Sequence, residues 1–269
     1  MKCGEIMKIR VSVLASGSSG NSIYISSNKF SLLIDAGLSG KEISHRLKKI
    51  GVCAEELDAV LVTHEHSDHI KGVGVLSRRY DLPIYANELT WQEAASHLGK
   101  IKEKNCQVFK GDFSLGDLDI SPFSTSHDAV SPVGYIISCG KTNIGVATDT
   151  GYISSEMEER LRGLDLLVIE ANHDLDMLMN GGYPWHLKKR INGDKGHLSN
   201  DAAAALLPRL INSNFPRILL AHLSKDNNRP ELAYITVKNS LENNGIYIDR
   251  DLKLDMCCRD KPTGLYELG

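Results

Sequence analysis

The densest group of metal-binding side chains in this sequence is the run H-E-H-S-D-H at 64–69. It follows an apolar stretch that predicts a buried strand running out into a loop. Because alternate residues of an extended segment point the same way, His64 and His66 would hold one ion, and Asp68 and His69 would turn toward a second. Imidazole and carboxylate ligands suit Zn, Mn or Fe rather than Ca or Mg. The alternative is a polar loop that is merely rich in histidine.

Four further polar residues stand where apolar runs end, namely Asp35, His127, Asp149 and His222. Each alone is more often a cap or turn residue than a ligand. Together with the 64–69 cluster, however, they supply enough ligands for two metal shells. We therefore expect two divalent transition-metal ions per chain, roughly 3.5–4 Å apart, as in other two-metal hydrolases.

Alternating β-rich and helical segments must position these side chains. Apolar and alternating runs predict strands at 9–14, 22–26, 31–34, 59–62, 84–86, 107–109, 118–123, 134–138, 143–147, 166–169 and 218–221. Helices are expected at 39–50, 70–80, 89–98, 156–162, 199–210 and 231–243, with Ser39 and Ser199 as N-caps. A hairpin turn is expected at 16–21 and an irregular segment at 171–196. Two packed sheets with helices outside fit this order.

Composition limits the partners and the compartment. The 269 residues carry 31 basic and 34 acidic side chains, a net charge of −3, so metal or a local patch must hold any polyanion. No apolar run approaches the roughly 20 residues that span a bilayer, and the N-terminus lacks a signal peptide, with Met7 an alternative start to Met1. The cysteines lie dispersed at 3, 53, 106, 139, 257 and 258. We expect reduced, mostly buried thiols in a cytoplasmic protein.

The order of these motifs, D-A-G, H-x-H-x-D-H, a middle His, an Asp and a late His, resembles the metallo-β-lactamase superfamily over residues 8–222. The resemblance implies an α/β fold, an αββα sandwich of two mixed β-sheets with a dinuclear site between them. The ligand sets implied by position are His64, His66 and His127 for one metal, and Asp68, His69 and His222 for the other. Asp149 would bridge both metals, and Asp35 would orient a ligand histidine from outside the ligand set.

Asp149 and the residues that follow it indicate which branch of the superfamily the sequence resembles. Asp149 is a carboxylate where many lactamases have cysteine, while Glu170 and His197 resemble the acidic and histidine motifs of the nuclease branches. Only 47 residues separate Asp149 from His197, too few for an inserted β-CASP domain, so residues 1–269 are expected to form one domain. The sequence segments that resemble compact YycJ/WalJ-type exonucleases lie at 14–21, 170–174, 182–184, 187–191 and 196–200. This resemblance implies a metal-dependent 5′-to-3′ exonuclease acting on DNA, linked to repair.

The expected reaction is phosphodiester hydrolysis by a metal-bridging hydroxide. The expected catalytic residues are Asp68, Asp149, Glu170 and His197. His197 would protonate the leaving oxygen, and Glu170 would orient it. The alternatives are a strand-end charge at Glu170 and a helix-start residue at His197. A thioesterase or lactonase would share the metals without needing this pair, and a non-catalytic binding domain is disfavoured because no ligand position is missing.

Residues expected to bind nucleic acid are Ser18, Ser19, Asn21, Tyr183, Trp185, Lys188, Lys189, Arg190 and Ser199, with Lys195 near the mouth. Polar groups would donate to phosphate oxygens, rings would stack on bases, and cations would attract phosphates. The alternatives are a solvated face for the basic run 188–190 and loop packing for the two aromatic residues. DNA is favoured over RNA. His45, His97 and His186 are expected at the surface.

Overall fold

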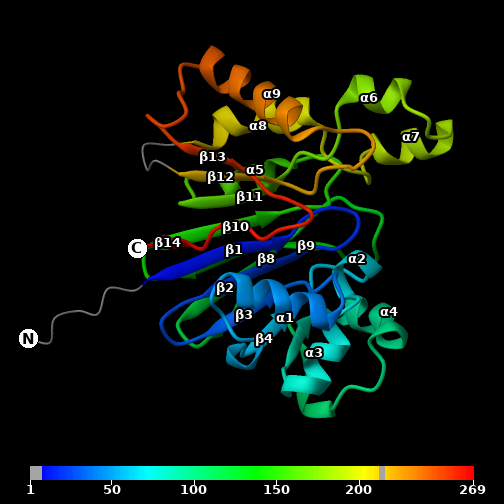
Figure 1. Cartoon of the computed structure of the whole chain (residues 1–269), viewed down its shortest axis with the longest axis vertical. Coiled ribbons are helices and arrows are strands. Elements are labelled where there is room, and N and C mark those ends of the chain that lie inside the picture. Colours follow the sequence, from blue (N-terminus) through cyan, green and yellow to red (C-terminus); the bar gives the residue numbers. More distant parts are fainter. Residues whose placement is uncertain (1–7, 212–215) are drawn as a thin grey trace, which may run out of the picture.

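A computed structural model describes residues 8–211 and 216–269. Within these residues, short aliphatic and β-branched runs form two seven-stranded sheets (Figure 1). The strands of the first sheet, in spatial order, are β14 (Tyr266–Leu268), β1 (Ile9–Ala15), β2 (Ser22–Ser26), β3 (Ser31–Ile34), β4 (Ala59–Leu61), β5 (Ile84–Ala86) and β6 (Cys106–Val108). Neighbours are antiparallel from β14 to β3 and parallel from β3 to β6.

The second sheet has the same mixed character. Its strands, in spatial order, are β13 (Lys253–Met256), β12 (Arg217–Ala221), β11 (Leu166–Glu170), β10 (Thr142–Ala147), β9 (Val133–Cys139), β8 (Leu118–Ser124) and β7 (Phe113–Leu115). Neighbours are parallel from β13 to β10 and antiparallel from β10 to β7. The two sheets pack face to face through buried side chains such as Ile25, Leu61, Ile137 and Val168.

Helices cover the outer faces of both sheets (Figure 1). On the first sheet these are α1 (Gly40–Lys49), α3 (Val73–Tyr80) and α4 (Glu88–Leu98); on the second they are α5 (Ser155–Leu161), α8 (Asn200–Leu210) and α9 (Pro230–Asn243). Their apolar residues, such as Leu47 and Leu207, complete two further cores. The predicted αββα sandwich is therefore confirmed. Short helices α2 (Ser67–Ile70), α6 (Leu175–Asn180) and α7 (Trp185–Ile191) lie at one end.

The expected strands and helices are found with bounds shifted by a few residues. Ser39 and Ser199 cap their helices as predicted, accepting hydrogen bonds from the amides of Glu42 and Ala202. The expectation that 171–196 is irregular is wrong, because α6 and α7 form there. Strands β7, β13 and β14 and two 3-10 turns, Ala54–Glu56 and Glu103–Asn105, were not predicted, since three-residue to four-residue segments carry little periodicity.

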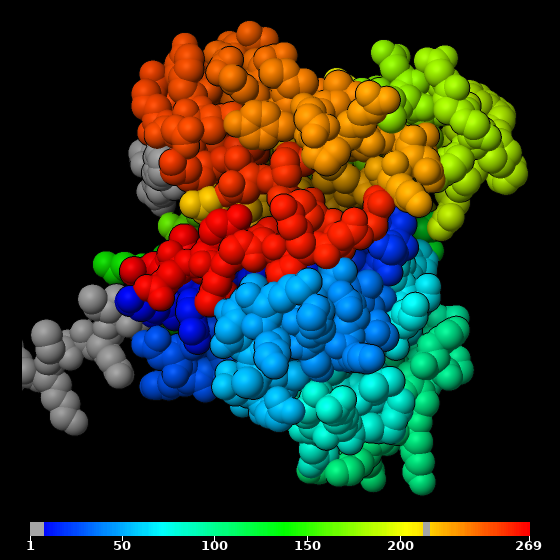
Figure 2. Space-filling view, viewed as in Figure 1, coloured from blue at the N-terminus to red at the C-terminus, as the bar shows by residue number. Residues whose placement is uncertain are grey.

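Residues 253–268 complete both sheets. Strand β13 pairs with β12, and β14 then pairs with β1, so this C-terminal segment supplies one edge of each sheet. Figure 2 shows it in red, crossing the molecule between the orange α9 side and the blue α1 side. The buried guanidinium of Arg46 fastens the crossing, because its Nη1 donates to the carbonyls of Leu14 and Arg259 at 3.0 and 2.7 Å.

The thiols only partly match expectation. Cys139 and Cys257 are buried, but Cys53 and Cys106 are exposed, and all are free. Cys3 and the choice between Met1 and Met7 as the start lie outside the described residues. Among residues 8–211 and 216–269, no helix is long and apolar enough to cross a membrane.

Candidate metal centre

The site forms where neighbouring strands of both sheets end. Asp35 follows β3, His64 lies just beyond β4, Asp149 lies just beyond β10, and His222 follows β12. Three of them, Asp35, Asp149 and His222, have left-handed backbones with φ of 59°, 56° and 55°. Such strained conformations persist where surrounding structure imposes them, and they cluster at functional sites. Here each turn aims a polar side chain back into the gap between the sheets.

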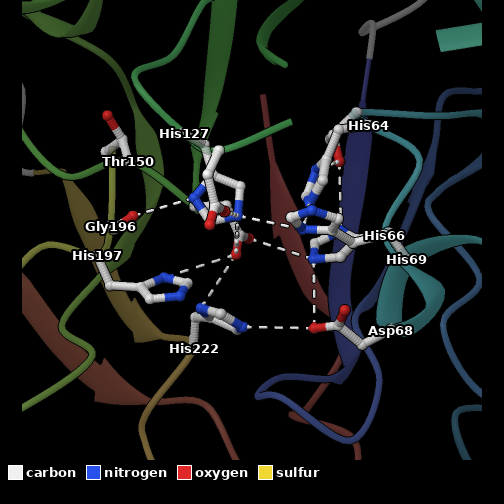
Figure 3. Close-up of polar contacts among 12 residues, drawn as sticks. His64, His66, Asp68, His69, His127, Thr150, Gly196, His197 and His222 are labelled. Carbon is white, nitrogen blue, oxygen red and sulfur yellow. Dashed lines mark hydrogen bonds and ion pairs between the residues drawn. The ribbon is translucent and has the colours of Figure 1, made fainter. Parts of the chain in front are cut away.

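The imidazoles of His64, His66 and His127 converge on one point (Figure 3). Nδ1 of His66 lies 3.2 Å from Nε2 of His64 and 3.3 Å from Nε2 of His127. Nδ1 of His127 donates to the carbonyl of Gly196 at 3.0 Å, which leaves its Nε2 facing the other rings. Three ring nitrogens at this spacing form a ligand set suited to a divalent transition metal.

A second ligand set lies beside the first. Nε2 of His69 and Nε2 of His222 lie 3.7 and 3.8 Å from Oδ2 of Asp68. His69 is fixed from behind, because its Nδ1 donates to Oδ2 of Asp35 at 2.7 Å. The hydroxyl of Thr63 donates to that same carboxylate oxygen at 2.7 Å. The structure thus pairs Asp35 with His69 in the geometry expected of an orienting carboxylate.

Asp149 lies between the two ligand sets. Its Oδ2 is 3.3 Å from Nε2 of His69, and its Oδ1 is 3.8 Å from Nε2 of His127 and 3.4 Å from Nδ1 of His222. Among the described residues, Oδ2 of Asp149 and Nε2 of His222 are buried without hydrogen-bond partners. Buried polar atoms are normally paired, so unsatisfied oxygen and nitrogen atoms facing one space fit a site built for a cation.

Glu170 joins His197 to this centre. Its Oε1 accepts from Nδ1 of His197 at 2.8 Å and from Nδ1 of His222 at 2.7 Å. Its Oε2 accepts from the amides of Thr150 and Leu198 at 3.0 and 3.2 Å. The carboxylate is fully buried at the end of β11, whereas the His197 ring is partly exposed toward the cavity.

The electrostatics follow from the close packing of carboxylates and imidazoles. Burial disfavours charge on His222, but Asp149, Asp68 and Glu170 outweigh it and raise its pKa to about 10. Burial likewise opposes the Glu170 carboxylate, yet His197 and His222 lower its pKa to about 2. Burial and the neighbouring His69 lower the pKa of His64 well below its usual value. Neutral His64 is a competent ligand, and the raised pKa of His222 reflects how strongly the surrounding carboxylates favour positive charge at this centre.

A cavity of about 270 Å³ opens above these residues, lined by both ligand sets, His197, Ser18 and α7. Two polar contacts hold α7 and the loop before it over the cavity. Tyr183 donates to Oδ2 of Asp226 at 2.7 Å, and Arg190 forms an ion pair with Asp128. The cavity therefore has room for a small group, and these two contacts hold one of its walls in place.

Three of the predicted substrate-binding residues are committed elsewhere. Lys188, expected to attract phosphates or else to lie on a solvated face, is instead buried, and its Nζ donates to the carbonyl of Met179 at 2.6 Å. The Ser199 hydroxyl caps α8, and the buried Asn21 accepts from the Gly17 amide at 2.8 Å and contacts the ligand loop. Periodicity could not reveal the inward orientation of Lys188, because α7 spans only seven residues.

The other predicted residues lie at the cavity or on the surface. Ser18, Tyr183 and Arg190 line the cavity. Ser19, Lys189 and Lys195 are exposed, as are His45, His97 and His186. Trp185 is 61% exposed, with the Lys189 ammonium over its ring, so it does not pack the loop down.

Some supporting residues were not predicted. Thr63 bridges Asp35 and His64, and Asn172 donates to the His222 carbonyl at 2.8 Å. Asp128 holds Arg190 in an ion pair. Their signal was their position beside a ligand or motif residue in sequence, which is weak because polar residues at strand ends are common.

The fold and these ligand sets define a metallo-β-lactamase-type hydrolase. A family model described as a beta-lactamase superfamily domain matches residues 31–222. The solved metallo-β-lactamase fold protein YhfI from Bacillus subtilis, 19% identical, superimposes with a TM-score of 0.73 over 97% of this chain and 100% of that one. The chain belongs to this superfamily and, within it, to the family that contains the WalJ and YycJ proteins.

That narrower assignment rests on two relatives of matching length. Exodeoxyribonuclease WalJ of Streptococcus pneumoniae serotype 2 (strain D39 / NCTC 7466) is 45% identical over 263 residues, which cover 96% of this chain and 98% of that protein. Exodeoxyribonuclease YycJ of Bacillus anthracis is 44% identical over 259 residues, with the same coverage of both chains. The similarity therefore extends well beyond the shared metal-binding motifs.

Proposed function

We propose that this chain is a metal-dependent exodeoxyribonuclease that removes nucleotides stepwise from the 5′ end of a DNA strand. The observation that carries the proposal is the junction of two ligand sets at Asp149, with Glu170 tying His197 to the same centre. A lactonase or thioesterase has no need of that histidine and carboxylate pair. The names of the two full-length relatives support the same reaction class.

We propose that the residues hold two divalent ions of Zn, Mn or Fe. His64, His66 and His127 would hold one ion, and Asp68, His69 and His222 the other, with Asp149 ligating both. The mixture of imidazole and carboxylate in these sets fits these metals. When bound, such ions lower the pKa of water and neutralise the charge of a phosphodiester.

His197 would supply the proton that the leaving oxygen of the DNA strand requires. Its Nδ1 is committed to Glu170, so Nε2 is the atom free to serve the substrate. By accepting from Nδ1, Glu170 orients the His197 ring and fixes its tautomer. This arrangement supports a role for His197 as general acid with Glu170 as its orienting carboxylate, and general-acid catalysis typically contributes 10²–10⁴-fold in rate.

Ser18, Tyr183 and Arg190 would contact the terminal nucleotide, since they line the cavity. Ser19, Trp185, Lys189 and Lys195 would add outer contacts to bases and phosphates. We further propose that residues 1–269 act as one domain, without an inserted nucleic-acid-binding domain, in a cytoplasmic repair reaction.

The decisive experiment combines metal analysis with an end-labelled degradation assay. Purified protein is assayed on 5′-labelled and 3′-labelled DNA and RNA, with a thioester and bis-p-nitrophenyl phosphate as comparison substrates. We expect two ions per chain and mononucleotide release from the 5′ end of DNA. Release only from the 3′ end would contradict the polarity. Fast thioester hydrolysis without nucleic-acid cleavage would instead identify a thioesterase.

A further inference from the structure

A second hollow lies next to the metal centre and has no role in the proposed chemistry. It has a volume of about 550 Å³ and is lined by Ser224, Lys225, Arg259 and Lys261, among others. Ser224 also lines the catalytic cavity, so the two hollows meet at this residue. Lys225, which lines the second hollow, is only three residues beyond the expected ligand His222 in sequence.

We call this second hollow the groove. Its three cations, Lys225, Arg259 and Lys261, form no ion pair within the described residues. No carboxylate there lies within ion-pair distance of Lys225, Arg259 or Lys261, and both lysines are exposed. Asp260 is the acidic residue of the lining, so the groove keeps a positive excess. By contrast, α7 presents less charge than its sequence suggests, because Lys188 is buried and Arg190 is paired with Asp128.

The loop between β1 and β2 borders both the catalytic cavity and the groove, and it carries backbone amides that can donate to a ligand. Ser16 lines the second groove, and Ser18 lines the catalytic cavity. Arg259 lies under this loop, its Nη2 3.5 Å from the carbonyl of Leu223 and its Nε about 3.5 Å from where a Cβ on Gly17 would stand. In the part of the chain that the structure describes, the Ser18 and Ser19 amides have no hydrogen-bond partner.

We propose that this groove binds the single-stranded part of the DNA that stays polymeric after each cut, on the 3′ side of the scissile phosphate. This inference rests on the proposed function. Unpaired cations and free amide donors recognise successive phosphates without reading sequence. The catalytic cavity takes the end of the strand, and the strand then passes Ser224 and Ser18 into the groove of Lys225, Arg259 and Lys261.

The test compares two double variants of equal charge change. Lys225→Ala/Lys261→Ala alters the groove, whereas Lys29→Ala/Lys141→Ala alters two exposed lysines in turns at the opposite end of the strands. KM is measured on the metal-loaded enzyme for a 5′-phosphorylated dinucleotide and for a strand of about 16 nucleotides, an upper site size for such grooves. Binding of a labelled strand is followed by fluorescence anisotropy against salt.

For the groove variant, the ratio of the long-strand KM to the dinucleotide KM should rise by about 3-fold to 10-fold, as two exposed ionic contacts are lost. Its salt slope of binding should fall by about 0.7 for each lysine. The control variant should match wild type in both measurements. An equal rise for both substrates, or an equal effect of the control variant, would overturn the proposal.

These outcomes separate the groove from the reaction. If the wild-type protein cleaves no strand, the proposed function fails, and the anisotropy comparison still decides whether the lysines hold DNA. If it cleaves DNA and both double variants bind the long strand like wild type, the groove proposal fails while the nuclease stands. Arg259→Gln provides an independent variant, because it alters the third cation without touching either lysine.

Discussion

Nδ1 of His197 lies 2.8 Å from Oε1 of Glu170, and that same oxygen lies 2.7 Å from Nδ1 of His222. One buried carboxylate therefore orients both a proposed metal ligand and a proposed proton donor. The arrangement leaves Nε2 of each ring to serve the cavity. His197 and His222 share Glu170 as a partner. Their roles can therefore be distinguished only by variants that remove one of the two contacts and keep the other.

His197→Ala should retain fold and metal but lose about 10²-fold to 10⁴-fold in kcat on DNA, because the leaving oxygen loses its proton donor. The loss should be much smaller on bis-p-nitrophenyl phosphate, since nitrophenolate leaves without a proton. Steady-state kinetics on both substrates, with metal analysis of the variant, make the comparison. Equal losses on the two substrates would indicate a phosphate-binding role instead.

Glu170→Gln should harm both functions of the shared carboxylate. The neutral amide is a weaker acceptor for the Nδ1–H of His222. The ligand ring therefore loses basicity and orientation, and metal affinity should fall by about 10-fold to 100-fold in addition to the loss of rate. Competition with a chelator measures the affinity. His197→Gln is the matched control, because it removes the same contact with Glu170 but leaves the contact to His222.

Asp149→Ala should lose activity and at least one ion per chain, because Asp149 reaches both ligand sets. Metal content measured before and after dialysis against a chelator gives the stoichiometry. Asp68→Ala removes a ligand of one set only, so it should keep the other ion. A fully active wild-type enzyme carrying a single tightly bound ion would refute the two-metal proposal.

The order of the elements and the polar residues at their ends were predictable because strand runs and ligand motifs are local in sequence. Asp35, Asp149 and His222 were recognisable as polar residues at the ends of apolar runs. Which of them meet depends on strand order, and no local pattern reports that order. The pairing of Asp35 with His69 and the double contact of Glu170 are products of the parallel registers of β3 with β4 and of β11 with β12.

The surroundings of the three basic residues of α7 were not predictable for a related reason. Lys188, Lys189 and Arg190 are equivalent in sequence, but a helix turns consecutive residues by about 100° and sends them to different surroundings. Lys188 enters the protein, Lys189 covers Trp185, and Arg190 meets Asp128. Lys225 lies in the loop after β12 and Lys261 in the loop after β13, and neither belongs to a motif that the sequence analysis could single out.

Gly37→Ala should destabilise the protein by at least about 3 kcal/mol, because a Cβ there would lie 1.6 Å from the carbonyl oxygen of Asp68. The ligand loop would have to move, so metal affinity should fall as well. Gly111→Ala is the control: a Cβ at Gly111 meets nothing within 4 Å, and the free energy of unfolding should change by less than about 1 kcal/mol. Urea unfolding of both variants measures the difference.

Tyr266 should make the protein less stable in alkali. Burial and the nearby Asp255 raise the pKa of Tyr266 to about 12, against about 10 in an unfolded chain. As the pH rises between these values, the unfolded chain loses the phenolic proton first, so the free energy of unfolding falls. Tyr266→Phe should flatten that fall in urea titrations at about pH 9 to 12, and an unchanged pH dependence would contradict the prediction.

The edge strands β13 and β14 also bear on how the molecule matures. Residues 253–268 leave the ribosome after every strand that they cover, so β12 and β1 present open hydrogen-bonding edges in the nascent chain. The bond from Arg46 to the carbonyl of Arg259 cannot form earlier, and neither can the wall of the groove beside the metal centre. The nascent chain therefore lacks the proposed DNA-binding groove. If the groove binds DNA as proposed, this binding can begin only after β13 and β14 have paired with their sheets.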